Sequence, residues 1–371
     1  MKPTNFNVEL FTQFDVKELG VKWQTLEKKT THRFFMSWYW IQAWLISFSV
    51  RPVLVEVKLD GSVVGLALVC LRTTFKHGCL PVRQCAIQES GNPLFDQQWI
   101  EYNQLLIDDQ FTDAVAKRIV RTLVNDLQWD ELLFGVATEQ SIQTLSASYP
   151  FRIKYRWSSE SHGIELNKIR ETGDNYISTL SKNTRAQIRR SIKEFEKRGP
   201  IVVEHAASFA QAKEFLAAIA PMHKAKWGTA YQQSGFANAH FCEFHNKLIE
   251  LAWPDSCVDL IKVRAGDTII AYLYNFKYQN RVYFYLSAVT SFADNKLRPG
   301  LTSHALCIQE YLDDDYEYYD FMGGGEAYKD RLASKTGKFH RVTFQQPRLK
   351  LKIEDKLRDI KVFIKNKLVR L

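Results

Sequence analysis

The stretch from Arg281 to Arg331 constrains the fold most, because it combines a strand, a turn, a helix and a second strand. Residues 281–289 are aromatic and β-branched at a two-residue period, which predicts a strand. Pro299-Gly300 then interrupts the chain, and apolar residues at 301, 305, 308 and 312 recur at helical spacing. Residues 316–321 predict a second strand. This order predicts a parallel βαβ unit with a right-handed crossover.

The turn at Pro299-Gly300 has the chemistry of an anion site. A helix N-terminus presents free backbone N–H groups, and a glycine leaves room for a phosphate to approach them. We therefore regard Gly300, with the amides of Leu301 and Thr302, as a candidate pyrophosphate site, and Arg298 as a cation beside it. The alternative is an ordinary turn between a strand and a helix.

Length, composition and charge narrow the class of protein. A chain of 371 residues with 46% apolar and 13% aromatic residues is sufficient for two packed domains and is not disordered in composition. The net charge is +9, but residues 348–371 hold nine Lys/Arg against three Asp/Glu, a surplus of six. The rest of the chain is nearly balanced, so nucleic acid is an unlikely partner. The six cysteines form no C-x-x-C pair, and no metal-ligand spacing occurs. We expect reduced thiols, no metal and a cytoplasmic location.

An internal repeat indicates two copies of one α/β unit. The hairpin around Asp60-Gly61 matches the hairpin around Gly266-Asp267, with Val55 aligned to Ile261, an offset of 206 residues. Before its crossover helix, the first copy has Asp108-Asp109-Gln110, whose carboxylates would repel a phosphate. A phosphate-bearing ligand is therefore expected in the second copy.

The order and spacing of these elements resemble the core of the GNAT acyltransferase superfamily. More narrowly, they resemble the branch of the CelD/BcsL cellulose-biosynthesis acetyltransferase-like proteins, relatives of the Fem-type peptidyl transferases. The resemblance covers roughly the whole chain. The residues that carry it are Tyr283-Phe-Tyr-Leu-Ser287, Pro299-Gly300, Asp320-Phe321, Gly324, Tyr328-Lys329, Leu180–Arg190, His223 with Trp227, and Phe35 to Trp44. Two departures are that only Gly300 of the usual pyrophosphate loop is kept, and that Gly323 and Gly325 stand where an arginine and an acid are usual.

The resemblance implies an α/β fold of two tandem GNAT-like domains with mixed sheets flanked by helices. Residues 1–150 would form a degenerate N-terminal domain and residues 151–347 the domain that binds the acyl donor. Residues 348–371 would form a basic amphipathic C-terminal helix. Such a helix suits either packing on the body of the protein or peripheral contact with the inner face of a membrane.

The resemblance also implies a coenzyme A thioester, acetyl-CoA, as the co-substrate. In addition to Arg298, Gly300, Leu301 and Thr302, the donor would contact Tyr285 and Ser287. Tyr328 would protonate the leaving thiolate, and His223, Asp320 and Glu326 are candidate bases. For His223 the alternative is a buried core histidine, and for Asp320 a structural pairing with Lys329 or an arginine. Candidate acceptor-binding residues are Arg185, Arg189, Trp227 and Lys329.

The expected function is transfer of an acyl group from coenzyme A to an amine or hydroxyl. The branch suggests a sugar or sugar-nucleotide acceptor in surface polysaccharide biosynthesis. One alternative is a Fem-like transferase that uses a charged tRNA, with the basic helix of residues 184–197 on the RNA. Another is a non-catalytic GNAT-like scaffold at a membrane synthase.

Overall fold

The structure is a computed structural model that describes residues 5–48 and 51–368, and the chain forms two compact units. Unit 1 comprises Met1–Ser158 and Phe339–Leu371, and unit 2 comprises Ser159–Lys338. Each unit has its own hydrophobic core. The predicted domain boundaries after residues 150 and 347 stay predictions.

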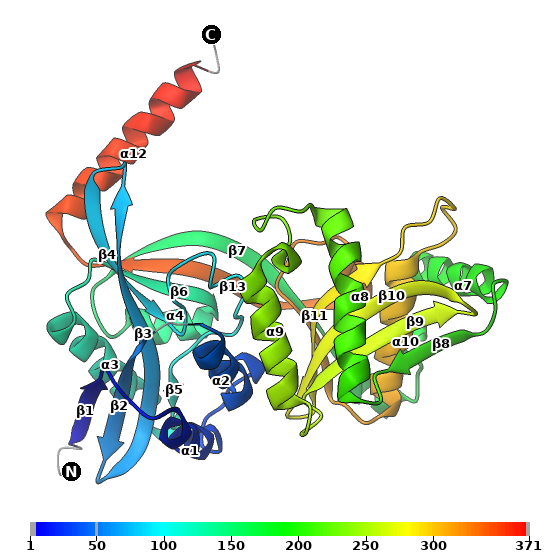
Figure 1. The fold of residues 1–371 in the computed structure, drawn as a ribbon, viewed down its shortest axis with the longest axis horizontal. Coiled ribbons are helices and arrows are strands. Elements are labelled where there is room, and N and C mark those ends of the chain that lie inside the picture. Colours follow the sequence, from blue (N-terminus) through cyan, green and yellow to red (C-terminus); the bar gives the residue numbers. More distant parts are fainter. Residues whose placement is uncertain (1–4, 49–50, 369–371) are drawn as a thin grey trace. The chain divides into compact units, whose positions relative to one another are not determined.

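Unit 1 is built on a mixed sheet with the strand order β1-β2-β3-β4-β6-β13, and β5 pairs with β3 (Figure 1). Its strands are β1 (Phe6–Phe11), β2 (Val53–Leu59), β3 (Ser62–Lys76), β4 (Leu80–Ile87), β5 (Leu106–Ile107), β6 (Glu131–Thr138) and part of β7 (Arg152–Glu165) and β13 (Ser334–Gln345). Its helices are α1 (Val16–Glu27), α2 (Trp38–Ser47), α3 (Thr112–Asp126), α4 (Glu139–Ser146) and α12 (Leu349–Leu368), with short 3-10 turns η1 (Phe34–Met36) and η2 (Asp109–Phe111).

Unit 2 has the strand order β7-β12-β11-β10-β9-β8. Its remaining strands are β8 (Ile201–His205), β9 (Val258–Ala265), β10 (Thr268–Tyr278), β11 (Arg281–Val289) and β12 (Tyr318–Met322). Its helices are α5 (Leu166–Thr172), α6 (Tyr176–Thr179), α7 (Lys182–Glu196), α8 (Phe209–Trp227), α9 (Ala239–Ala252), α10 (Pro299–Asp313) and α11 (Lys329–Leu332), with η3 at Gly235–Ala237. Helices α8 and α9 cover one face of β9 and β10, and α7 and α10 cover the other (Figure 1).

The predicted repeat is present as a shared topology. In unit 1, β2 and β3 form a hairpin, β4 follows antiparallel, and α3 leads to β6, which pairs parallel with β4. In unit 2, β9, β10, β11, α10 and β12 repeat this order. The first hairpin turns at Asp60 and Gly61, both with positive φ, as a type I′ turn requires.

The structure differs from the sequence prediction at several element boundaries. Residues 34–47 do not form one continuous helix, because Ser37 separates the 3-10 turn η1 from α2. Strands β1 and β7 were not predicted. β1 lies at the edge of its sheet and pairs with β2, a partner more than 40 residues away in sequence. The first half of β7 does alternate, with Ile153, Tyr155 and Trp157 between polar residues, but the sequence prediction overlooked this largely exposed segment.

The C-terminal helix α12 is attached to unit 1 by its first turns. Leu351 is buried, and the carboxylate of Asp355 pairs with Arg152 and Lys154 of β7. Leu357 and Ile360 of the predicted apolar face are exposed. The side chains of Ile364 and Leu368, and Leu371 itself, lie outside the described residues. Within residues 5–48 and 51–368, no helix combines the length and apolarity needed to cross a membrane.

Candidate active site

The core of the site is a fork between two parallel strands of unit 2. β11 and β12 pair only from Arg281 with Tyr318 to Tyr283 with Asp320, although β11 continues to Val289 and β12 to Met322. On its other side β11 stays paired with β10 up to Val289, with a β-bulge at Tyr285. β-Bulges redirect side chains and are frequent beside active sites. The strands therefore part where an extended ligand could pair with the backbone of β11.

The N-terminus of α10 lies at the end of β11 and is left uncapped. Its N-cap residue is Arg298, which provides no side-chain hydrogen bond to the helix, and Pro299 occupies the first turn. A Cβ atom added at Gly300 would meet nothing nearer than Cγ2 of Val289, at 4.0 Å. The guanidinium of Arg298 is exposed and makes no ion pair or hydrogen bond within the described residues. Free amides, open space and a free cation are the properties of an anion site.

Ser191 of α7 fixes the position of this helix end. Its hydroxyl oxygen accepts a hydrogen bond from the backbone N–H of Arg298, at 2.9 Å, and one from Oγ1 of Thr302, at 2.8 Å. Thr302 is fully buried, and Leu301 packs into the core of unit 2. Of the predicted donor residues, Gly300 and Arg298 are therefore accessible, whereas Thr302 can contribute its backbone only.

An aromatic cluster fills the base of the fork. The imidazole of His304, on α10, lies 4.6 Å from the ring of Phe284 on β11 and 5.2 Å from that of Phe321 on β12. The phenol ring of Tyr328 stacks on His304 at 5.3 Å with an interplanar angle of 12°. Tyr328 therefore lies where the two strands separate, in contact with Phe321 of β12 and with His304 of α10.

The protonation states in this cluster suit a proton donor. Burial, with a smaller contribution from Lys329, lowers the pKa of His304 to about 3, so the imidazole is neutral. Its Nδ1 atom is buried and without a hydrogen-bond partner in the described part of the chain. Burial, with Glu326 nearby, raises the pKa of Tyr328 above its usual value. Its hydroxyl makes no hydrogen bond to any described residue, so the proton is available to a ligand.

The turn between β12 and α11 holds the other predicted residues of this region. Met322 and Gly324 have positive φ, and a side chain on Gly324 would collide with Glu326 and Lys329. The ammonium group of Lys329 is buried, bonds to the carbonyl of Gly323 and pairs with Glu326 at 3.2 Å. Lys329 thus closes the turn, and Glu326 remains exposed.

Asp320 has structural partners on both of its oxygens. It is buried, and Oδ1 accepts the backbone N–H of Met322 at 2.8 Å. Oδ2 lies 3.5 Å from Nη1 of Arg281, one strand away. This geometry agrees with the structural alternative for Asp320, with an arginine rather than Lys329 as its partner.

The predicted pair of His223 and Trp227 lies on α8, on the other face of the sheet. Nδ1 of His223 is 2.8 Å from the hydroxyl of Ser234, and burial together with Lys226 lowers its pKa to about 4. Trp227 is 48% exposed at the end of α8, with the ammonium of Lys226 over its ring. No recorded contact links His223 to Tyr328, so the structure does not bring these two candidates together.

The two arginines predicted on α7 differ in their surroundings. Nη1 of Arg185 donates to the backbone carbonyl of Ser178 at 2.7 Å, so its guanidinium stabilises the C-terminal end of α6. Arg189 is exposed and without a recorded partner among the described residues. Only Arg189 of this pair is free to meet a substrate.

Sequence reasoning placed His304 near the phosphate turn as a further candidate base, but it missed the aromatic contacts of His304 and a separate charged cluster. His304 lies one helical turn after Gly300, and that spacing was the only available signal. Elsewhere in unit 2, the two ring nitrogens of His205 lie 2.9 Å from Asp259 and 2.9 Å from Glu310. Burial lowers the pKa of His205, but these carboxylates outweigh that effect and raise it to about 10. With both nitrogens donating, His205 is a structural cation and not a base.

The equivalent fork in unit 1 is occupied by the protein itself. β4 and β6 pair in parallel from Gln84 to Ile87, and β6 then continues alone on that side. The buried Asn103 enters there, with Nδ2 donating to the carbonyl of Ile87 at 2.9 Å and its backbone N–H donating to Val136 at 3.0 Å. Among the described residues, no group of three or more His, Cys, Asp or Glu could hold a metal ion.

Comparison with known proteins agrees with this geometry. Residues 182–330 match the sequence profile described as the acetyltransferase (GNAT) domain. The chain is similar to the crystal structure of FemX, with 12% identity, a TM-score of 0.56 and coverage of 90% of this chain and 96% of that chain. It also resembles a conserved protein of unknown function from Bacteroides thetaiotaomicron VPI-5482, with 10% identity, a TM-score of 0.55 and coverage of 92% and 100%. L-PGS from Bacillus licheniformis is similar too, with 9% identity, a TM-score of 0.53 and coverage of 88% of this chain and 92% of that chain. No curated protein sequence matches significantly.

The forked parallel strands and the crossover helix lie within the residues that match the acetyltransferase (GNAT) profile, so the profile and the geometry agree on this part of the chain. Residues 182–330 are its acetyltransferase (GNAT) domain, and the chain shares its fold with FemX over most of its length. The predicted α/β fold with tandem GNAT-like units is confirmed, and the likeness to FemX is one of fold.

Proposed function

We propose that unit 2 transfers an acyl group, in the first place acetyl, from coenzyme A to an amine or hydroxyl acceptor. The observation that carries this proposal is the fork of β11 and β12 beside the uncapped N-terminus of α10. The pantetheine arm would pair with the backbone of β11 near Tyr285 and Ser287. The pyrophosphate would lie at Gly300 and Leu301, next to Arg298.

The chemistry follows from the position of Tyr328. The acceptor attacks the thioester carbonyl, the carbon–sulfur bond breaks, and the thiolate takes a proton from the Tyr328 hydroxyl. Backbone N–H groups of the fork would polarise the carbonyl. Glu326, exposed at the same turn, is the candidate base that removes the acceptor proton. Arg189 would offer a charge to an anionic acceptor, whereas His223 and Trp227 lie on the other face of the sheet and have no role in this step.

For the acceptor we propose a sugar or sugar-nucleotide used in surface polysaccharide biosynthesis. Support for it comes from the sequence resemblance to the cellulose-biosynthesis branch. An acceptor screen of amino sugars, sugar-nucleotides and simple amines with acetyl-CoA, read by release of the free thiol, tests this directly. Transfer to none of the sugars, with turnover on other amines, would disprove the acceptor and leave the donor proposal standing.

The donor is tested by calorimetric titration with coenzyme A and with tRNA. Coenzyme A should bind to the wild-type chain, and Gly300→Glu should abolish that binding without unfolding the protein. Gly300→Gln has the same bulk without the charge, so it should weaken binding less than Gly300→Glu. Gly300→Ala should leave the fold intact, because the added Cβ has 4.0 Å of clearance. Normal binding to Gly300→Glu would show that the donor lies elsewhere.

A Fem-like reaction with charged tRNA is the second candidate, and the surface of α7 favours it. Arg189, Lys193 and Arg198 are exposed on or just after this helix, whose Ser191 touches the start of α10. If tRNA is the donor, Arg189→Gln with Lys193→Gln should weaken tRNA binding and leave coenzyme A unaffected. A chain that binds neither donor at millimolar concentration would instead be the non-catalytic scaffold.

A further inference from the structure

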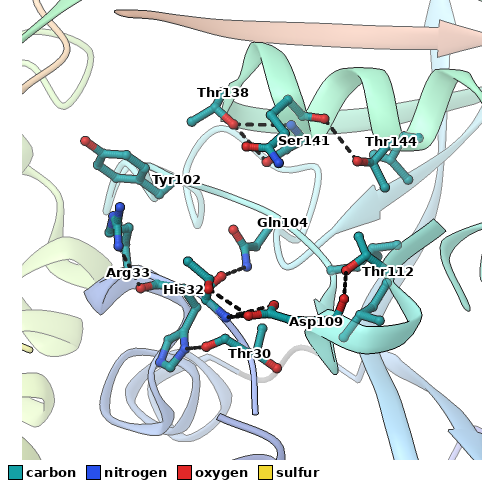
Figure 2. Close-up of a pocket in the computed structure, with 15 residues that line it drawn as sticks. Thr30, His32, Arg33, Tyr102, Gln104, Asp109, Thr112, Thr138, Ser141 and Thr144 are labelled. Atoms are coloured by element: carbon teal, nitrogen blue, oxygen red, sulfur yellow. Dashed lines mark hydrogen bonds between the residues drawn. The ribbon is translucent and has the colours of Figure 1, made fainter. Parts of the chain in front are cut away.

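A polar pocket of about 220 Å³ is lined entirely by residues of unit 1, and none of these residues is proposed for acyl transfer. Four segments line it: residues 30–33 before η1, residues 102–107, the start of η2 and α3, and the first turns of α4 (Figure 2). Pockets for drug-sized ligands have about 300–1,000 Å³, so the volume here suits a ligand no larger than a monosaccharide.

One wall of the pocket presents an arginine that has no carboxylate partner among the residues that the structure describes. Arg33 is half-buried, and its guanidinium lies over the ring of Tyr102 at 5.9 Å. Its recorded hydrogen bond within the described residues is a long one, 3.4 Å, to the carbonyl of His32. A guanidinium that is oriented by an aromatic ring and lacks an anion can form two parallel hydrogen bonds to a carboxylate.

The backbone of Tyr102 is held in a costly conformation at this position. Its φ is 52°, a value that bulky residues rarely adopt and that costs roughly 1–3 kcal/mol. The ring packs edge-on against Phe339 at 4.7 Å and stacks near Phe35 at 6.4 Å. The fold therefore keeps Tyr102, and with it the guanidinium of Arg33, in one orientation at the pocket.

The opposite wall is composed of groups that accept hydrogen bonds. The amide of Gln104 donates to the carbonyl of Thr31 at 2.9 Å, which leaves its oxygen as an acceptor. The carboxylate of Asp109 is fixed by the backbone N–H and the hydroxyl of Thr31, at 2.9 and 2.7 Å, and can accept further bonds. Thr138 and Ser141 bond to each other at 3.0 Å on the α4 side. These acceptors match the hydroxyl groups of a ligand.

We propose that this pocket binds a monosaccharide-sized, hydroxylated carboxylate. Its carboxylate would pair with Arg33, and its hydroxyls would donate to Asp109 and Gln104. A ligand with more negative charge is disfavoured by Asp109, and a neutral sugar leaves Arg33 without a partner. The proposal concerns unit 1 alone and does not depend on the acyl donor.

The test uses glucuronate, glucose and glucosamine, which differ chiefly in charge, titrated into the full chain with detection by saturation-transfer NMR. Glucuronate should bind in the millimolar range or tighter, glucose about tenfold more weakly, and glucosamine most weakly. Equal binding of glucuronate and glucose, or no binding of glucuronate at millimolar concentration, would overturn the proposal. This comparison needs no variant, so it does not depend on the stability of a mutant.

Variants then locate the contact. Arg33→Gln should lower the affinity for glucuronate about tenfold or more and remove the preference over glucose. Arg33→Lys keeps the charge and should retain the preference with lower affinity. Arg118→Gln, an exposed position on α3 outside the pocket, is the matched control and should bind as the wild type does. Unchanged glucuronate binding in a folded Arg33→Gln protein would contradict the assignment.

Discussion

Three tyrosines of unit 2 allow chemistry to be separated from stability, because their hydroxyls differ in surroundings. The Tyr328 hydroxyl has no hydrogen bond to any described residue. The Tyr176 hydroxyl is buried and donates to the carbonyl of Leu332 at 2.6 Å. The Tyr319 hydroxyl is buried and without a partner in the described part of the chain. Each can be removed by a Tyr→Phe substitution that leaves the ring in place.

The expected free energies follow from these contacts. Tyr328→Phe breaks no internal hydrogen bond, so the free energy of unfolding should change by less than about 0.5 kcal/mol. Tyr176→Phe leaves the Leu332 carbonyl without its partner and should cost about 1–3 kcal/mol. Tyr319→Phe removes a buried hydroxyl without a partner and should be neutral or stabilising by about 1 kcal/mol. Urea denaturation of the three variants measures these differences.

The same three variants should differ in turnover in another way, with a large loss expected only for Tyr328→Phe. If Tyr328 is the general acid, Tyr328→Phe lowers acetyl transfer by roughly 10²–10⁴-fold, while coenzyme A still binds. Tyr176→Phe and Tyr319→Phe should turn over at nearly the wild-type rate when assayed well below their melting temperatures. Because burial raises the pKa of Tyr328, its deprotonation should not reduce the wild-type rate between pH 7 and about pH 10. Normal turnover by Tyr328→Phe would show that the residue only packs and that the acid lies elsewhere.

Two further predictions concern charge. The folded-state pKa of His205 is about 10, above its ordinary 6.5, so its ion pairs stabilise the fold fully below about pH 6.5 and are lost as the pH rises towards 10. The side chain is 35% exposed, so we expect a modest loss of about 1–2 kcal/mol between pH 7 and 10 in urea denaturation, absent in His205→Gln. The second prediction concerns α12, where Leu357 and Ile360 are exposed beside lysines. The full chain should therefore cosediment with anionic vesicles but not with neutral ones. A chain that ends at Pro347 should cosediment less. Equal sedimentation of the two chains would exclude this membrane contact.

The sequence was sufficient to predict the βαβ core because its signals are local. The alternating aromatic residues of β11, the Pro-Gly pair before α10 and the apolar period of that helix each act within a few residues. The same holds for the hairpin at Asp60-Gly61. β7 carries a local signal as well, since Ile153, Tyr155 and Trp157 alternate with polar residues, but the prediction overlooked it, and its pairing with β12 joins residues far apart in sequence.

The site was predictable only where a motif marks it. Gly300 was found from the Pro-Gly turn before α10, and Tyr328 was found from the resemblance to the GNAT superfamily. The contact of His304 with Phe284 and Phe321 depends on where the strands separate, which no local pattern encodes. The roles of Lys329 and Arg185 within the protein were also not predicted. The sequence does not show whether a lysine or arginine side chain will donate a hydrogen bond to a backbone carbonyl or remain free for a ligand.

The two halves of the chain differ in ways that support placing the donor in unit 2. The sequence suggested that Asp108 and Asp109 exclude a phosphate from unit 1 by repulsion. The structure adds two causes. In unit 1 the 3-10 turn η2, capped by Asp108 through the N–H of Gln110, stands directly before α3, whereas α10 begins at Arg298 and Pro299 without such a turn. Asn103 also bridges the strands of the first fork, so an extended ligand would have to displace two buried hydrogen bonds. A helix end and a fork that already bind the protein's own groups have no capacity left for a nucleotide thioester, and unit 1 remains free for a different ligand.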